Sequence, residues 1–214
     1  NRVDRIDEPL NAICWLMKDP TLPPVLRLTD PALAATMGAT LATKRPSAER
    51  LAPGVDPNAI VIESYANPFR TYPLAMDYQR FKKLISDGVE CYILNTGEFM
   101  GKKVTKNDTL GILEALVEGE AKFVPFGGIP GIEVLEWRDF VIDFNDDNYV
   151  VNLYNRMLDR LTFIRSRDID KYGMDMLPAD AHEAICSVIE HIHGMAKNPS
   201  MLKPIPPRLW NASK

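Results

Sequence analysis

Short apolar runs that alternate with helical patterns are the feature that most restricts how this chain can fold. Three runs are short enough for β-strands and are bounded by proline, glycine or polar residues: "AICWLM" (12–17), "AIVIES" (59–64) and "VECYILN" (89–95). We expect the first of them to be a buried strand. Because strands separated by helices favour an α/β layer, we predict a mixed sheet flanked by helices, in a single domain over residues 1–214.

Capping residues predict where two of the helices begin and end. Asp30 followed by Pro31 is an N-cap before a first-turn proline, which predicts a helix over 31–42. A second helix is expected between Pro73 and Gly88, because glycine commonly ends a helix. The segment between these helices, 43–58, carries three prolines and a glycine and is expected to be a loop.

Apolar residues at helical spacing predict three further helices. The first ends near Gly119, and the other two form a C-terminal pair within 147–195. "FVPFGGIPGIEV" is rich in turn residues and is expected to be irregular with a short strand, while the tail from Asn198 is expected to be extended. The three stripes are Leu110, Leu113, Leu116 and Val117; Val150, Leu153, Tyr154, Met157, Leu158, Leu161 and Ile164; and Ala181, Ala184, Ile185, Val188 and Ile192.

The composition limits the classes of function. Apolar residues make up 46% of the 214 residues and charged residues 25%, which is ordinary for a globular protein with a sizeable core. The net charge of −4 gives no basic footprint, so we expect no nucleic-acid partner. No apolar run reaches the roughly 18 residues of a membrane span, so we expect no membrane partner. Three widely spaced cysteines predict reduced thiols and a cytoplasmic location.

The segment "NTGEFMGKKVTKNDT" (95–109) is the strongest local signal for a binding site. It is not a Walker A motif, because only three residues separate Gly97 from Gly101 and Lys103 stands where Ser or Thr would bind magnesium. A strand delivers Asn95 to the sheet edge, and a helix with free N–H groups follows the loop. The strand–loop–helix over 89–119 therefore predicts a nucleotide or phosphate site, with a plain connection as an equal alternative.

Two further patterns resemble metal sites. His182, Cys186, Glu190 and His193 fall on one helical face and could hold zinc, although ligands on one straight helix rarely close a tetrahedron. We therefore interpret them as a solvated face. "DFNDDN" (143–148) lacks the glycine and glutamate of a calcium loop and is interpreted as a turn and helix cap. "GGIPG" (127–131) is interpreted as a tight turn, and no spacing indicates a catalytic residue.

Several segments, taken in order, resemble the C-terminal part of ATP-dependent phosphoenolpyruvate carboxykinase. The family's Leu-Val-Asn-Thr-Gly-Trp, Gly-Lys-Arg-Ile and Asp-Thr are matched by "ILNTG", "GKKV" and "NDTLGILEAL". Upstream, "LPPVLRLTDPALAATMGAT" is similar to the family's Leu-Pro-Pro-Val segment and its helix, and "YANPFRTYPLAMDYQRFKKLISDGVECYILNTG" to the run that leads to the same strand. Downstream, "IPGIEV" is similar to Leu-Pro-Gly-Val. The resemblance covers roughly residues 12–172.

The resemblance implies roles for individual residues. The family's adenosine-contacting Arg-Ile falls on Lys103 and Val104, and its helix-opening Thr falls on Thr109. Asn95 and Gly97 match the strand end beneath that site. The family's mobile lid would start near Thr40 and include the basic residues Lys44, Arg45 and Arg50 of the 43–58 loop.

Three departures from the family's pattern affect this region. Glu98 replaces a Trp, the glycine loop is one residue shorter, and Lys103 replaces an Arg. Lysine is a point charge without the planar, stacking fork of arginine. These changes leave the nature of the substrate open.

The resemblance implies an ATP-binding part of a carboxykinase-like enzyme, a lyase or kinase that transfers a phosphoryl group to a small carboxylate. Its P-loop, its oxaloacetate-binding residues and its ligands for Mg or Mn lie upstream of the segment matched here. The first residue, Asn1 rather than Met, predicts that an N-terminal remainder of the parent protein is a partner. We therefore expect this segment alone to be inactive. The alternatives are a diverged kinase with another substrate and a non-catalytic nucleotide-binding or interaction module.

Overall fold

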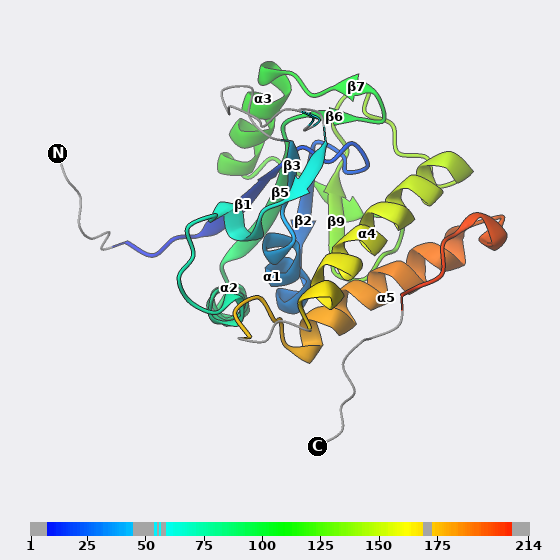
Figure 1. Cartoon of the computed structure of the whole chain (residues 1–214). Helices are drawn as coiled ribbons and strands as arrows, with labels where there is room; N and C mark the ends of the chain where they lie inside the picture. Colours follow the sequence, from blue (N-terminus) through cyan, green and yellow to red (C-terminus); the bar gives the residue numbers. More distant parts are fainter. Residues whose placement is uncertain (1–7, 45–53, 55, 57–58, 169–172, 207–214) are drawn as a thin grey trace.

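A mixed five-stranded sheet with helices on both faces forms the centre of the computed structural model, which describes residues 8–44, 54, 56, 59–168 and 173–206 (Figure 1). β1 and β5 pair in parallel, and the other three pairings are antiparallel. The predicted mixed sheet flanked by helices is therefore confirmed. In order across the sheet, the strands are β1 (Ala12–Met17), β5 (Glu90–Asn95), β2 (Val25–Leu28), β9 (Ile132–Leu135) and β8 (Phe123–Pro125).

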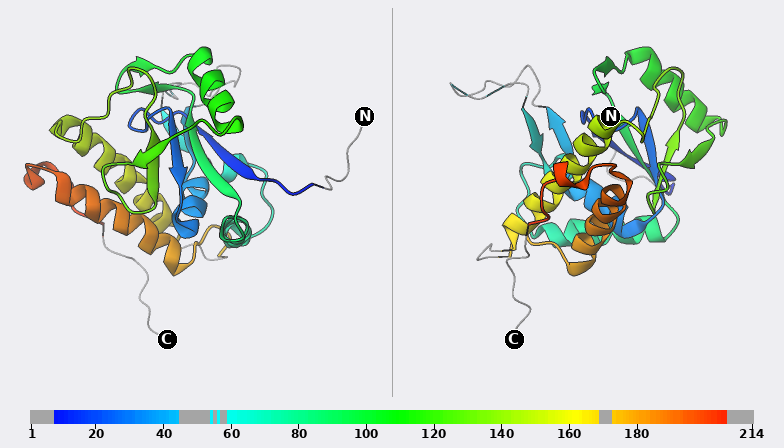
Figure 2. Two further views of the ribbon diagram at one scale, coloured as in Figure 1. Left: turned by 180° about the vertical axis from the view of Figure 1, so that it is seen from behind. Right: turned by 90° about the vertical axis from the view of Figure 1, so that its right-hand side faces the viewer.

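Successive residues of β5, the second strand of the sheet, point to opposite faces and divide the core in two. In β5, Cys91 and Ile93 belong to the larger core, whereas Tyr92 and Leu94 belong to a smaller one. Helix α3 (Lys106–Val117) covers the smaller core, and the right-hand view of Figure 2 shows it across the sheet from α4 and α5. The larger core is covered by α1 (Pro31–Ala39), α2 (Leu74–Ser86), α4 (Asp147–Arg167) and α5 (Ala179–Met195).

The predicted helices are all present, and their caps explain their ends. The Asp30 carboxylate accepts a hydrogen bond from the Leu33 N–H (2.6 Å) at the start of α1, and Gly88 follows α2 with a φ of 102°. α1 ends at Ala39 rather than at the predicted residue 42, because Ala42 begins a strand. In the part of the chain that the structure describes, no helix has both the length and the apolar character to cross a bilayer.

β1 differs from the buried strand that we predicted. It is an edge strand, and only one of its faces is covered: Trp15 and Met17 are buried, whereas Cys14 and Leu16 are exposed. Cys91, on the neighbouring strand, points to the opposite face from Cys14. An apolar run alone could not show that one of its two faces lacks a cover.

The sequence analysis did not predict four of the strands, β2, β3, β6 and β7, and did not place a fifth, β4, outside the main sheet. "VLRL" forms the central strand β2, and "AIVIES" supplies β4 (Ile60–Ile62), which pairs with β3 (Ala42–Lys44) outside the main sheet. The glycine loop is a hairpin of β6 (Glu98–Phe99) and β7 (Lys102–Lys103). The remaining regular segments are the 3₁₀ turns η1 (Ser64–Ala66) and η2 (Pro199–Met201).

Candidate functional site

The carboxyl ends of the two parallel strands meet at one end of the sheet. β1 leads into the loop at residues 18–22, and β5 leads through Asn95 into the β6–β7 hairpin and then into α3. The hairpin turns at Met100 and Gly101, whose φ angles of 47° and 80° are those of a two-residue turn that favours glycine. Ligands of open α/β sheets commonly bind outside the carboxyl ends of their parallel strands.

Asn95 holds these two connections together. Its amide nitrogen lies 2.8 Å from the Asp19 carbonyl, 2.6 Å from that of Leu22 and 2.8 Å from that of Glu98. Its amide oxygen accepts the Gly97 N–H at 3.1 Å, and the side chain is buried. Because both ends of the amide already have partners, Asn95 shapes the site rather than offering a group to a ligand.

Gly97 and Val104 pack the base of the hairpin. A Cβ atom at Gly97 would lie 3.2 Å from the Lys18 Cβ, a closer approach than most side-chain contacts allow. The Val104 N–H donates to the Gly97 carbonyl (2.9 Å), and the Val104 side chain is 4% exposed within the larger core. Its backbone lies at the site, while its side chain is occupied in packing.

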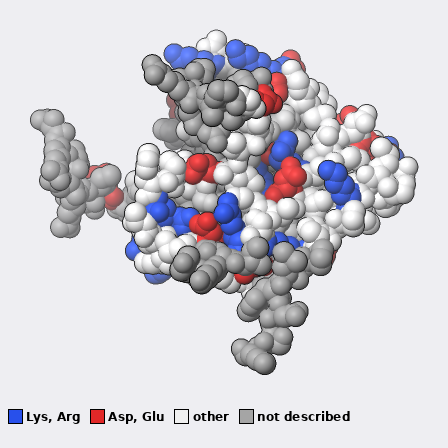
Figure 3. Space-filling model, viewed as in Figure 1, with Lys and Arg blue, Asp and Glu red and all other residues white. Residues whose placement is uncertain are grey.

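Lys103 and Thr109 are the accessible residues of the predicted nucleotide site. Lys103 is exposed on β7 directly opposite Glu98, and it forms no ion pair with any described residue. The half-buried Thr109 donates its hydroxyl to the Thr105 carbonyl at 3.3 Å. Lysine and arginine side chains gather at the upper edge of Figure 3, over β7 and α3. Acidic side chains lie beside them, so this end of the molecule carries charges of both signs.

A capping box closes the N-terminus of α3. The Thr105 hydroxyl accepts the Asp108 N–H (3.2 Å), and the Asp108 carboxylate accepts the N–H and the hydroxyl of Thr105 at 2.9 and 2.6 Å. Trp137 and Arg138 also donate to Asp108, at 3.3 and 3.0 Å. The hydrogen bonds from Thr105, then those from Trp137 and the charge of Arg138, lower the pKa of Asp108. The carboxylate already neutralises this helix end, which leaves little attraction there for a phosphate.

Of the four residues that the resemblance assigns to a lid, the structure describes Thr40 and Lys44. Thr40 is buried, its hydroxyl donates to the Thr36 carbonyl (2.8 Å), and it is a fixed part of the α1–β3 connection. Lys44, the last residue of β3, pairs with Glu98 (Nζ–Oε1, 3.5 Å). Arg45 and Arg50 lie outside the described residues. Glu98, which stands where the resembled family has Trp, thus binds the first basic residue of the lid-like loop.

The zinc pattern on α5 does not converge in the structure. His182 is buried, with its Nε2 3.3 Å from an Asp168 oxygen, whereas Glu190 and His193 are exposed. Among the described residues, no group of three or more His, Cys, Asp or Glu side chains could hold a metal ion. The solvated-face interpretation was nevertheless wrong for His182, which is buried and lies against Asp168 at the end of α4.

The aspartate-rich segment "DFNDDN" and the glycine-rich segment "GGIPG" have the structural roles that we predicted. The Asp146 carboxylate caps α4 by accepting the Asn148 N–H (2.9 Å), and that of Asp143 accepts the Asn145 N–H (2.8 Å). In "GGIPG", Gly127, Gly128 and Gly131 all have positive φ, as a tight turn requires.

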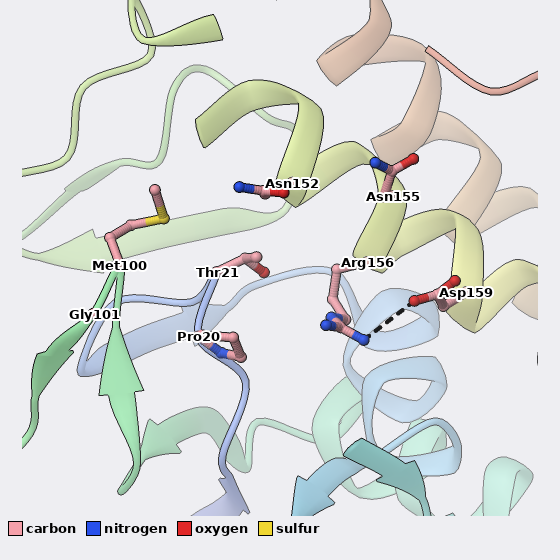
Figure 4. A pocket seen from close by; sticks show the side chains of 8 residues that line it. All are labelled: Pro20, Thr21, Met100, Gly101, Asn152, Asn155, Arg156 and Asp159. Atoms are coloured by element: carbon pink, nitrogen blue, oxygen red, sulfur yellow. Dashed lines mark hydrogen bonds and ion pairs between the residues drawn. The ribbon is translucent and has the colours of Figure 1, made fainter. Parts of the chain in front are cut away.

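A pocket of about 360 Å³ borders the hairpin tip, and sequence reasoning missed it. Figure 4 shows Asn152 extending from α4 towards Met100, while Arg156 projects towards the loop of Pro20 and Thr21. The α4 residues that line the pocket recur at helical spacing on the polar side of the helix, a pattern that usually indicates a solvated face. The lining residues are Pro20, Thr21, Met100, Gly101, Asn152, Asn155, Arg156 and Asp159.

A buried ion pair lies behind this pocket. Arg160, which is fully buried, places Nη2 2.9 Å from Asp19 Oδ2 and donates from Nη1 to the Thr40 carbonyl. Asp19 also accepts the N–H and the hydroxyl of Thr21, at 3.1 and 2.8 Å. The pair joins α4 to the loop after β1 and to the end of α1, so it fixes the floor of the candidate site.

Comparison with known proteins assigns no family. No model of a protein family matches the chain, and no curated protein sequence matches it. The structure therefore defines a mixed α/β protein with a candidate ligand site outside the carboxyl ends of two parallel strands.

Proposed function

We propose that this chain provides the base-binding end of an ATP site in a carboxykinase-like enzyme that transfers a phosphoryl group to a small carboxylate. The observation that carries the proposal is the meeting of two segments of the resemblance at one end of the sheet. The Asn95 side chain of "ILNTG" donates to the carbonyl of Leu22, the first residue of the Leu-Pro-Pro-Val-like segment, and to that of Asp19, which precedes this segment. If both segments contribute to one binding site, they are expected to lie together in the folded protein although they are distant in sequence.

The chemistry of the accessible residues suits a nucleoside better than a triphosphate. Lys103 offers a cation near a sugar or ring, and Thr109 offers a hydroxyl near the start of α3. The Thr105 N–H already donates to the Asp108 carboxylate, and the Asp108 N–H donates to the Thr105 hydroxyl, so these two N–H groups are not available to a phosphate. In the proposal, phosphate and Mg or Mn are held by residues with no counterpart in this chain, and the enzyme is cytoplasmic.

Calorimetric titration of ATP and of adenosine into the protein tests the proposal. We expect Thr109→Ala to weaken ATP binding by about 0.5–1.5 kcal/mol, the usual net value of one hydrogen bond. Lys103→Ala should cost somewhat more, because hydrogen bonds to charged groups are stronger. Adenosine should show the Thr109 effect as well, since the site holds the base end. Without a P-loop, the chain should hydrolyse no ATP.

Lys122→Ala is the matched control, because this exposed lysine follows the opposite end of α3. Its ATP affinity should equal that of the unsubstituted protein. If the unsubstituted protein and the three variants are folded and bind ATP with equal affinity, the resemblance to the carboxykinase family concerns the fold and not the binding site.

A diverged kinase with a different acceptor is the second candidate function. The Lys44–Glu98 ion pair favours it, because a carboxylate and its partner lysine replace an aromatic side chain at the edge of the site. Binding of ATP without any effect of malate, oxaloacetate or phosphoenolpyruvate would support this candidate over the carboxykinase.

A further inference from the structure

We propose that the pocket between the hairpin tip and α4 is a second site, which binds a small molecule through a carboxylate or phosphate group held by Arg156. This site is separate from the proposed nucleotide end. Lys103 and Thr109 do not line it, and its wall comes from α4 and the loop after β1. Its volume of about 360 Å³ is at the lower end of the range for small-molecule pockets, roughly 300–1,000 Å³.

Arg156 has donor groups to spare. It is the only cation among the lining residues, and its described hydrogen bond runs from Nη1 to Asp159 Oδ2 at 3.1 Å. Its Nε is buried without a hydrogen-bond partner among the described residues, with the nearest Asp19 oxygen 3.7 Å away. A guanidinium carries five N–H groups in a planar fork that matches carboxylate and phosphate oxygens.

Neither neighbouring carboxylate satisfies this guanidinium fully. Asp19 is held by Arg160 and by the N–H and hydroxyl of Thr21. The Asp159 side chain is 58% exposed, against 25% for Arg156, and an exposed ion pair three residues apart on a helix contributes little. An incoming oxyanion can therefore replace Asp159 as the partner of the Arg156 guanidinium, whose Nε lies 3.7 Å from Asp19 Oδ1.

The other walls define what the rest of the ligand can be. Asn152 and Asn155 supply amide groups, and the Asn155 amide oxygen is buried without a hydrogen-bond partner among the described residues. Met100 is 43% exposed and supplies an apolar contact from the hairpin tip. The site thus suits an oxyanion on a small polar molecule with a hydrogen-bond donor.

The test is calorimetric titration of inorganic phosphate and of malonate, each at constant ionic strength, into the protein and its variants. At least one anion should bind, and the one that binds more tightly identifies the oxyanion class. Arg156→Gln should weaken binding at least tenfold, as loss of charged hydrogen bonds requires. Asp159→Asn should tighten it about two- to fivefold, because the competing carboxylate is removed.

Two controls separate the proposal from other effects. Arg80→Gln removes an exposed arginine that pairs with the buried Asp77, also three residues away on a helix, and should leave anion binding unchanged. Lys103→Ala should also leave it unchanged, so failure of the nucleotide proposal would not affect this one. The absence of saturable binding, or weaker binding in Asp159→Asn, would overturn the assignment even if Arg156→Gln fails to fold.

Discussion

At the scale of single residues, the candidate site depends on side chains that join segments distant in sequence. Asn95 reaches carbonyls 73 and 76 residues earlier, and Arg160 reaches a carboxylate 141 residues earlier. Both are buried, so each loss of a partner leaves an unsatisfied polar group in the interior. Such residues are positioned by the fold and in turn fix the geometry of the accessible residues around them.

Asn95→Ala should lower the free energy of unfolding by about 2–4 kcal/mol. The amide has two N–H groups shared among three carbonyls, and its removal takes one hydrogen bond from each of these carbonyls and from the Gly97 N–H, while the Asp19 carbonyl keeps the Leu22 N–H. Urea denaturation measures the change. Asn107→Ala, at an exposed asparagine in the first turn of α3, should change stability by less than about 0.5 kcal/mol. Similar effects of the two substitutions would contradict this role of Asn95.

Asp108→Asn should reduce the loss of folding stability that occurs as the pH falls. Hydrogen bonds from Thr105 place the folded-state pKa of Asp108 below its ordinary value of about 3.9. The ionised carboxylate therefore contributes stability that is present above about pH 4 and is lost as the pH falls through the folded-state pKa. Thermal melts from pH 6 to pH 2.5 should show the difference between the two proteins shrinking towards acid. A constant difference would rule out this linkage.

At the scale of elements, the hairpin shows how backbone conformation restricts sequence. Gly101 has a φ of 80°, and a Cβ there would meet no atom within 4 Å. Any cost of adding a side chain is therefore conformational rather than steric. Gly194, within α5, also has open space around its missing Cβ but no positive φ.

Gly101→Ala and Gly194→Ala should have effects of opposite sign. The first should destabilise by about 1 kcal/mol, because alanine disfavours the left-handed region. The second should stabilise by a few tenths to about 1 kcal/mol through the lower entropy of the unfolded chain and the higher helix propensity of alanine. Chemical denaturation of both variants compares the two signs directly. Equal signs would mean that the hairpin turn is not held in this conformation.

At the scale of the whole molecule, the buried Arg160–Asp19 ion pair connects α4 to the loop that follows β1. α4 and α5 pack on the larger core. Arg160 of α4 donates hydrogen bonds to Asp19, in the loop after β1, and to the Thr40 carbonyl, at the end of α1. Arg160 stands within the apolar stripe of α4, and a charged residue at such a position indicates a buried partner of opposite charge. The partner itself, Asp19, could not be identified without the fold.

Arg160→Met should lower the free energy of unfolding by about 3–5 kcal/mol, because it leaves the buried Asp19 carboxylate without its cation. Adding Asp19→Asn should cost less in this background than in the unsubstituted protein. A double-mutant cycle by urea denaturation measures the coupling. Strict additivity of the two substitutions would show that the pair contributes no interaction of its own.

The sequence by itself determined the helices and the strands β1 and β5, because caps and apolar spacing act over a few residues. Asp30, Gly88 and the stripe of α4 are examples of such local signals. Only the tertiary structure decided that "AIVIES" leaves the main sheet, that "VLRL" enters its centre and that one face of β1 stays exposed. The pocket at Arg156 was decided in the same way. Local spacing shows which face of an element is apolar or polar, whereas the partner that covers the face depends on pairing between residues far apart in the chain.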